Sequence, residues 1–306
     1  MIKRIIDQAL IFSIILAAHH IGNAQIEKSA RELPGVGLER TEIRTIHSDI
    51  VGQDYEILIS LPKSYSLQDT SYYPVIYLLD SYHSFSMVKG MTDVFARDLI
   101  MPEVIIVSIG YGIYGPEAQS DWIVGRTRDF TPVSSKFAEE WVEKSMEEIG
   151  LPKVEIQTGG APLFLNFIRT ELIPFVETNY RIDENRRTLS GYSFGGLFGL
   201  YVLFHDPTLF NKYFIGSPVI MYDKGITYEY EINYADTNPD LKAAIFMSSG
   251  EKEEAFAENV KKLTEILRSR NYEKLRLNTV IFEGEGHITC FPAAISRGLT
   301  ELFALE

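Results

Sequence analysis

The sequence predicts an α/β fold in which one open, mostly parallel sheet is flanked by helices. Three observations lead to this class. Two segments on either side of residue 50 alternate apolar and polar residues, as half-buried antiparallel strands do. Later runs are short and continuously apolar, like strands buried on both faces, and helix-period segments lie between several of them. An antiparallel start followed by this alternation specifies an open α/β sheet.

The expected strands follow one another along the chain. The antiparallel start consists of "TEIRTIHSDI" (41–50) and "DYEILISLP" (54–62), each of which ends at a turn. Six apolar runs are expected to continue the sheet: "YPVIYLLD" (73–80), "EVIIVSIG" (103–110), "RRTLSGYS" (186–193), "KYFIGSPVI" (212–220), "AAIFMSSG" (243–250) and "LRLNTVIFEG" (275–284).

Three later segments are expected to form helices that flank the sheet. Residues 161–180 place apolar side chains at three- and four-residue steps, with Pro174 as the one irregular position. Residues 253–270 repeat this pattern, and residues 291–305 form the last candidate helix. The helical stretch "SSKFAEEWVEKSMEEIG" lies outside this plan. Residues 133–160 are therefore expected to form a small cap or insertion, which either gates the substrate or carries a solvated acidic helix.

The first 24 residues are expected to be a secretory signal that takes no part in the fold. Lys3 and Arg4 precede an apolar run at 9–18, and "GNA" supplies small residues before Gln25. A run of 10 apolar residues is too short to span a bilayer, so no stable membrane insertion is expected after cleavage. Residues 25–306 would then form one exported domain, either periplasmic or secreted.

Composition and charge exclude several classes of function. The chain is 45% hydrophobic and 23% charged, as globular proteins are. Its formal net charge of −13 becomes −14 without the first 24 residues, which carry two cations and one anion, so nucleic acid is not an expected partner. The single cysteine, Cys290, excludes an internal disulfide. The remaining four histidines and one cysteine form no ligand cluster, so neither a metal nor an organic cofactor is expected.

The stretch "GYSFGG" (191–196) contains a Gly-x-Ser-x-Gly spacing, which is weak evidence by itself. Its context strengthens it, because a strand run ends at Leu189 and the apolar, helix-like "GLFGLYVLF" follows. A strand, a tight turn and a helix raise the serine hydroxyl above the sheet edge, and the flanking glycines relieve crowding in the turn. Ser193 is therefore the candidate nucleophile, against the alternative of a structural turn serine.

A candidate base and acid follow in the sequence. His287 stands in the expected loop after the last strand, in "FEGEGHITCF", and the carboxyl end of a strand is where an open α/β sheet presents reacting groups. The acid is expected after the preceding strand, where Glu251, Glu253 and Glu254 compete. A turn beginning at Gly250 favours Glu253, whose carboxylate would accept a hydrogen bond from the imidazole Nδ1–H. The alternative is that these carboxylates form a solvated helix start.

The order serine, acid, histidine is that of the α/β-hydrolase fold. Six segments together resemble the putative-esterase family of α/β hydrolases: "LLDSYHSF", "RTRDFTP", "GGAPLFLNFIRTELIPFVETNYRID", "RRTLSGYSFGGLFGLYVLFHDPTLF", "SPVIMYD" and "EGEGH". The branch that they resemble most is the ferric-siderophore esterases, which open catecholate trilactones of the enterobactin and bacillibactin type. The resemblance covers nearly all of the chain after the expected signal, and it implies a mostly parallel central sheet with flanking helices.

The resemblance also implies roles for individual residues. It places the family nucleophile on Ser193, the histidine on His287 and the acid on Glu253. The family oxyanion hole implies the backbone N–H of Phe194, together with a second donor from the loop "DSYHSF".

That second donor could be Ser81 or Tyr82, because this chain has serine at 81 where relatives usually have glycine. The loop "RTRDFTP" implies that Arg126 and Arg128 lie near the substrate. The alternative is that Arg128 pairs with Asp129 to hold the loop.

Together these residues predict an exported serine esterase that forms an acyl-enzyme. Its partner would be a small-molecule ester, with the trilactone of a ferric catecholate siderophore as the candidate. Two alternatives stay open, because fold alone does not fix function. One is an acyltransferase on the same scaffold, and the other is a catalytically silent hydrolase-fold binding protein.

Overall fold

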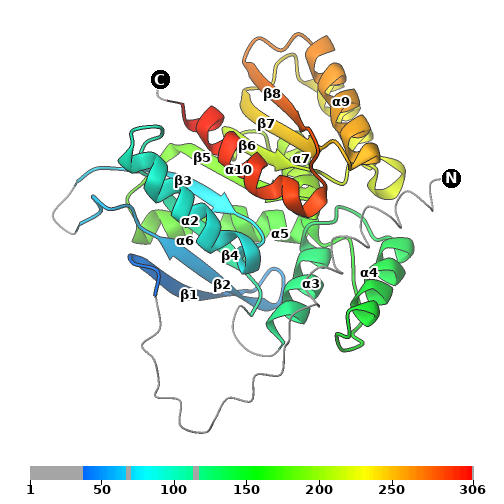
Figure 1. Ribbon diagram of the computed structural model, residues 1–306, viewed down its shortest axis with the longest axis horizontal. Coiled ribbons are helices and arrows are strands. Elements are labelled where there is room, and N and C mark those ends of the chain that lie inside the picture. The colour runs from blue at the N-terminus through cyan, green and yellow to red at the C-terminus, as the bar shows by residue number, and fades with distance from the viewer. Residues whose placement is uncertain (1–36, 67–69, 113–116, 305–306) are drawn as a thin grey trace, which may run out of the picture.

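The computed structural model describes residues 37–66, 70–112 and 117–304. The signal expected in residues 1–24 lies outside the described residues. A single sheet runs through the molecule (Figure 1), and its strands are β1 Thr41–Ser48, β2 Gln53–Ser60, β3 Tyr73–Leu78, β4 Ile105–Gly110, β5 Ile182–Tyr192, β6 Lys212–Gly216, β7 Ala243–Gly250 and β8 Leu275–Phe282.

Helices connect these strands and cover both faces of the sheet. Their bounds are α2 Ser81–Arg97, α3 Ala118–Asp129, α4 Lys136–Glu148, α5 Ala161–Phe167, the π-helical turn η2 Ile168–Leu172, α6 Ile173–Asn179, α7 Phe194–His205, the 3-10 turn η3 Tyr222–Lys224, α8 Ile226–Thr237, α9 Glu254–Ser269 and α10 His287–Phe303. None of the described helices has both the length and the apolar composition needed to cross a membrane.

The sheet has the strand order β1-β2-β4-β3-β5-β6-β7-β8. Pairing is antiparallel between β1 and β2 and between β2 and β4, and it is parallel between all later neighbours. The antiparallel start and the mostly parallel sheet predicted from the sequence are therefore confirmed, and the architecture is of the α/β-hydrolase type.

The helices form one layer on each face of the sheet. α2 and α10 cross in front of the sheet in Figure 1, and their buried side chains pack with those of the strands in one apolar cluster. α5, α6 and α7 lie behind the sheet, and the second and larger cluster includes Phe164, Phe198 and Val260. The carboxyl ends of the parallel strands stay open to hold a site between these layers.

Strand position decides which of the predicted apolar runs is buried. β3 and β4 lie inside the sheet, and all six residues of each are buried. β8 was expected to be buried on both faces, but it is only partly covered, with Arg276 and Asn278 exposed. It forms the edge of the sheet, so only one neighbouring strand, β7, pairs with it, although α9 and α10 both contact it.

α7 is the central helix that follows the candidate nucleophile. Its residues from Phe194 to Phe204 are all buried, and a helix that is apolar all round needs such a position. The helix contacts β5, β6, α3, α5 and α8. The first turn of α7 is thereby fixed to the sheet, which matters for a site built on that turn.

The irregular position in the helical segment 161–180 is not the one predicted. Pro174 was the expected irregular position, but it sits in the first turn of α6, where its missing N–H is tolerated. The irregularity lies just before it, in the π-helical turn Ile168–Leu172. A π-turn is a common way to absorb a disturbed hydrogen-bond ladder within a helix.

Three predicted loops are in fact parts of helices. "DSYHSF" opens α2, and "RTRDFTP" includes the last turn of α3, which ends at Asp129. His287 is the first residue of α10, so that helix begins four residues earlier than the sequence pattern indicated. The helix expected in the insertion 133–160 is present as α4, and the Ser135 hydroxyl accepts a hydrogen bond from the Ala138 N–H at its start.

Candidate active site

Ser193 occupies a sharp turn between β5 and α7. Its backbone has φ 59° and ψ −117°, an unusual conformation for a residue with a side chain. The Ser193 N–H donates to the Gly216 carbonyl at 2.9 Å, which anchors the turn to the end of β6. Its side chain makes no capping hydrogen bond to α7. This strained turn between a strand and a helix has the backbone geometry expected of a nucleophile elbow.

Two of the flanking glycines are required by close backbone approach. A Cβ atom on Gly191 would lie 2.2 Å from the Gly195 carbonyl oxygen. A Cβ atom on Gly196 would lie 2.9 Å from the Gly216 carbonyl oxygen. A larger residue at 191 would push the end of β5 away from the first turn of α7, and a larger residue at 196 would push α7 away from β6. The first glycine of the Gly-x-Ser-x-Gly spacing therefore has a steric cause here, and so does Gly196, which follows that spacing.

His287 lies at the carboxyl end of β8, at the start of α10, with its side chain 8% exposed. Its ring packs between Tyr192 and Phe256, with centroid separations of 5.3 Å and 5.1 Å. Its Nδ1 atom lies 2.6 Å from Oε2 of Glu253. With Nδ1 engaged in this way, Nε2 is the ring nitrogen that can accept a proton from a nucleophile.

The structure brings one of the three candidate carboxylates to His287. Glu253 is 2% exposed, and its other oxygen, Oε1, accepts hydrogen bonds from the Gly250 N–H at 2.7 Å and the Ser217 hydroxyl at 2.8 Å. Glu251 is exposed and accepts instead from the Gly284 N–H, while Glu254 is exposed in the first turn of α9. The turn at Gly250 therefore points Glu253 inward and leaves its neighbours in solvent.

Two helix N-termini meet beside Ser193. Phe194 is the first residue of α7, and Ser81 and Tyr82 are the first two residues of α2. The two helices are held together because the Leu79 N–H donates to the Ser190 carbonyl at 2.9 Å, across the β3–β5 pair. N–H groups in a first helical turn have no partner within their own helix, so both ends can donate to an anion.

Ser81 and Tyr82 differ in solvent exposure and in their side-chain contacts. Ser81 is 3% exposed, and its buried hydroxyl has no hydrogen-bond partner among the described residues. Tyr82 is 38% exposed and stacks on Trp122, with ring centroids 5.8 Å apart. The predictions for both backbone N–H groups stay open, because either group lies in the unbonded first turn of α2.

Arg126 was predicted to contact substrate, and the structure places its guanidinium on Asp80. Nε lies 2.6 Å from Oδ1 and Nη2 lies 3.1 Å from Oδ2, with each side chain only 12% exposed. Asp80 also accepts from the Trp122 indole N–H at 2.9 Å. Asp80 has a left-handed backbone, φ 60°, and directly precedes Ser81. Arg126 thus holds the residue on which the start of α2 turns.

Arg128 follows the alternative considered from the sequence. Its Nε and Nη2 atoms bind the two oxygens of Asp129 at 2.6 Å and 3.0 Å, and Asp129 is completely buried. The Tyr55 hydroxyl donates to the same carboxylate at 2.7 Å. Burial raises the pKa of Tyr55 far above its usual value, so this hydroxyl keeps its proton. Asp129 therefore ties α3 to β2 through Tyr55, and Arg128 balances its buried charge.

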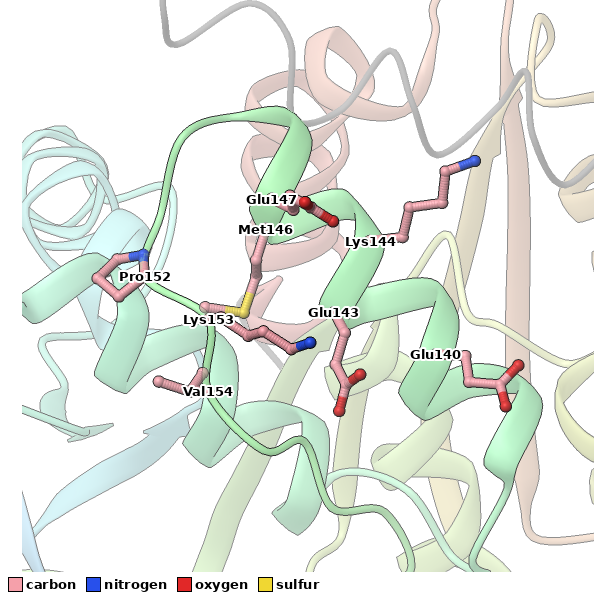
Figure 2. A pocket seen from close by; sticks show the side chains of 8 residues that line it. All are labelled: Glu140, Glu143, Lys144, Met146, Glu147, Pro152, Lys153 and Val154. Atoms are coloured by element: carbon pink, nitrogen blue, oxygen red, sulfur yellow. The ribbon is translucent and has the colours of Figure 1, made fainter.

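One cavity lies at the start of α2, and another lies beside α4. A cavity of about 620 Å³ is lined by Ser81 and Tyr82 of α2, together with Phe85 of the same helix and Ile43 of β1. Figure 2 shows a smaller one, of about 170 Å³, where Glu140, Glu143 and other side chains of α4 face residues 152–154. Within the described residues, no group of three or more His, Cys, Asp or Glu side chains is placed to hold a metal ion.

Comparison with known proteins identifies the family. The family model described as "Putative esterase" matches residues 48–152 and 144–292, which include Ser193, Glu253 and His287. The chain belongs to this family. The esterase is 32% identical over 285 residues to the ferri-bacillibactin esterase BesA of Bacillus subtilis, covering 87% of this chain and 90% of that protein.

Solved structures agree with this assignment. A BES protein from Bacillus cereus matches the esterase with a TM-score of 0.74 and 31% identity, over 90% of this chain and all of that chain. The siderophore hydrolase EstB from Aspergillus nidulans matches with a TM-score of 0.73 at 22% identity, over 89% and 98% of the two chains, and shares the fold. The protein is therefore a carboxylic-ester hydrolase with an α/β-hydrolase fold.

Proposed function

We propose that this esterase hydrolyses the ester bonds of a siderophore through an acyl-enzyme on Ser193. The observation that carries the proposal is the pair formed by His287 Nδ1 and Glu253 Oε2 at 2.6 Å, at the same edge of the sheet as the strained turn of Ser193. A buried carboxylate on Nδ1 fixes the imidazole tautomer in which Nε2 is the base. It also stabilises the imidazolium that forms during the reaction.

The first half of the proposed reaction acylates the enzyme. Ser193 Oγ attacks the ester carbonyl carbon while its proton passes to His287 Nε2, and the carbonyl electron pair moves to the oxygen. The N–H of Phe194 and an N–H of Ser81 or Tyr82 donate to that oxyanion. As the tetrahedral intermediate collapses, the C–O bond to the leaving alcohol breaks, and the alcohol takes the proton from His287.

The second half of the proposed reaction releases the acid. Water attacks the acyl carbon and gives a proton to His287 Nε2, and the same two N–H groups hold the second oxyanion. Breaking the bond to Ser193 Oγ frees the carboxylic acid, and the imidazolium returns its proton to the serine. Hydrogen bonds between a nucleophile and its base often tighten only when substrate is bound, so substrate would complete the alignment of Ser193 with His287.

The proposed substrate class rests on the relatives and on an exposed aromatic surface. The proteins that the esterase resembles include a ferri-bacillibactin esterase and a siderophore enterobactin esterase. Tyr82, His83 and Trp122 form a cluster next to the proposed oxyanion donors, with ring separations of 4.5–5.8 Å. Such rings can stack on the aromatic arms of a catecholate trilactone. We further propose that residues 1–24 direct export, which would bring the enzyme to siderophores outside the cytoplasm.

The decisive experiment compares the wild-type protein with Ser193→Ala. We expect labelling by a fluorophosphonate probe and hydrolysis of both a p-nitrophenyl ester and a ferric catecholate trilactone. Both activities should fall by about 10⁴-fold or more in Ser193→Ala, because the nucleophile is lost while the fold persists. Ser269→Ala, a change at the end of α9, is the matched control.

Three outcomes would contradict parts of the proposal. Half of the wild-type rate in Ser193→Ala would refute the acyl-enzyme. Turnover of simple esters without turnover of the trilactone would refute the substrate class. Transfer of the acyl group to an added alcohol in preference to water would identify an acyltransferase.

A further inference from the structure

A closed ring of polar contacts passes through the carboxylate of Glu253. His287 Nδ1 meets Glu253 Oε2 at 2.6 Å, and the Ser217 hydroxyl meets Glu253 Oε1 at 2.8 Å. Ser217 Oγ also lies 2.8 Å from the Tyr192 hydroxyl oxygen, and the Tyr192 hydroxyl lies 2.7 Å from the carbonyl oxygen of His287. The ring starts at the imidazole of His287 and returns to the backbone of the same residue.

The four members of this ring come from four neighbouring strand ends. Tyr192 is the last residue of β5, Ser217 follows β6, Glu253 follows β7, and His287 follows β8. These strands are consecutive in the sheet. Tyr192 is also the chain neighbour of Ser193, so the ring links the backbone of the proposed nucleophile to that of the proposed base.

Ser217 occupies a backbone position that would suit glycine. Its φ is 36°, in the left-handed region, and its side chain is completely buried. A serine at positive φ costs conformational energy that glycine would avoid. The Ser217 hydroxyl is hydrogen-bonded to Glu253 and Tyr192, and the Cys290 thiol, a weaker hydrogen-bonding group, also interacts with it. Glycine would adopt this positive φ at lower conformational energy, so the hydroxyl is what serine adds at position 217.

The number of hydroxyl protons available for hydrogen bonds gives Ser217 and Tyr192 different roles. An ionised Glu253 and the carbonyl of His287 can only accept, so Ser217 and Tyr192 supply two protons to three oxygen–oxygen contacts. Hydrogen bonds to a charged acceptor are the stronger ones, so Ser217 donates to Glu253. Tyr192 can then donate either to the His287 carbonyl or to Ser217. Ser217 is a fixed donor, whereas Tyr192 has two acceptors.

We propose that Ser217 and Tyr192 are positioning residues, which hold the Glu253–His287 pair in register with Ser193. The inference rests on the proposed function, since it concerns the same site. Ser217 fixes the Glu253 carboxylate so that Oε2 faces His287, and Tyr192 fixes the backbone from which the imidazole projects. Neither side chain reacts with the substrate.

The test measures kcat and KM of Ser217→Gly, Tyr192→Phe and the double variant with a p-nitrophenyl ester. Glycine removes the hydroxyl and relieves the positive φ, so Ser217→Gly should fold as well as the wild type. Its kcat is expected to fall about 10- to 100-fold, the loss that follows removal of outer hydrogen-bond partners from the ligands of metal sites, with KM within about twofold. Tyr192→Phe should lose less, because Ser217 keeps its bond to Glu253.

The double variant and a control complete the design. Because both hydroxyls act through one ring, the combined loss should be smaller than the product of the single losses. Tyr234 lies on α8, away from the site, and its hydroxyl donates to the backbone carbonyl of Asp240, so Tyr234→Phe should keep the wild-type kcat. Proton NMR should show the hydrogen-bonded Nδ1–H resonance of His287 in wild type and its weakening in Ser217→Gly.

The outcomes distinguish this inference from the proposed function. If Ser193→Ala abolishes turnover but Ser217→Gly and Tyr192→Phe keep kcat within about twofold of wild type, the positioning role is wrong and the acyl-enzyme stands. If Ser193→Ala is active, the proposed function itself fails. If Ser217→Gly does not fold, Ser217→Ala carries the same comparison, and unchanged kcat in that variant would overturn the inference.

Discussion

Replacing Arg126 with alanine tests what holds the start of α2. The change would leave the carboxylate of Asp80 12% exposed, with the Trp122 indole as its remaining side-chain donor. Removing one partner of a buried pair costs about 3–5 kcal/mol, and the surviving indole bond favours the lower end, near 3 kcal/mol. For a domain of this size, that loss corresponds to a fall in Tm of roughly 6–12 °C.

Activity should fall together with stability. Asp80 directly precedes Ser81 and Tyr82, so a displaced turn would misplace the proposed oxyanion donor. One oxyanion donor contributes about 10²–10³ in kcat, and a partly displaced donor should cost up to about 10²-fold. This loss should be equal for a neutral p-nitrophenyl ester and an anionic ferric trilactone, because the turn serves both.

The assay combines thermal unfolding with kinetics on both substrates. Asp80→Asn, which suits a left-handed backbone, is the partner variant. The double variant Arg126→Ala/Asp80→Asn should be more stable than the sum of the single losses predicts, because it leaves no unpaired charge. A Tm unchanged within about 2 °C, with KM raised for the ferric trilactone alone, would refute this reasoning and restore a substrate-binding arginine.

Two further predictions concern other groups. Burial raises the pKa of Cys290 to about 12, and the residue is fully buried. A thiol reagent should therefore not modify it at pH 8 until the protein is unfolded. Rapid modification of the folded protein would contradict this prediction. Hydrogen bonds from the Lys274 and Leu241 backbone N–H groups lower the pKa of Asp240 below 3.8. Its stabilising contribution is therefore present above pH 4 and is lost as the pH falls through the lowered pKa. In urea unfolding, Asp240→Asn should lose less stability than the wild type between pH 5 and pH 3. Equal losses in the two proteins would contradict this assignment.

Much of the fold could be predicted because strand order along the chain and apolar runs carry direct signals. The runs that form β3 and β4 are mostly apolar, and all of their residues are buried as those runs indicate. The turn at Ser193 could be predicted because its glycines and serine lie within six residues, and the close approach of Gly191 to Gly195 is local to that stretch. Local chemistry of this kind is visible in a single sequence.

Several of the errors lie at helix ends, where short patterns are ambiguous. The helical period of Phe85, Val88 and Phe95 could have indicated α2, but the preceding "DSYHSF" looks like a loop. The charge on Arg126 suggested a cationic pocket, and only the packing of α3 against the start of α2 shows that Asp80 neutralises it. Arg126 and Asp80 are 46 residues apart in the sequence, so no short sequence pattern indicates that they pair.

The ring residues illustrate the same limit. Ser217 lies 25 residues from Tyr192 and 36 from Glu253, and nothing in "IGSPVI" marks its serine as different from a turn residue. The positive φ and the contact with a buried carboxylate exist only once the four strand ends are side by side. Tyr192 was visible only as the variable residue of the Gly-x-Ser-x-Gly spacing.

The pairing of β3 with β5 also affects how the chain reaches this structure. Val75 pairs with Arg187, so more than a hundred further residues must be synthesised after β3 before β5, its second neighbour in the sheet, exists. Until then β3, with six residues that are all buried in the finished sheet, is an unprotected edge strand. Chains that stop before β5 therefore present an apolar strand edge to one another, and α2 begins folding beside a strand that is still open to misassembly.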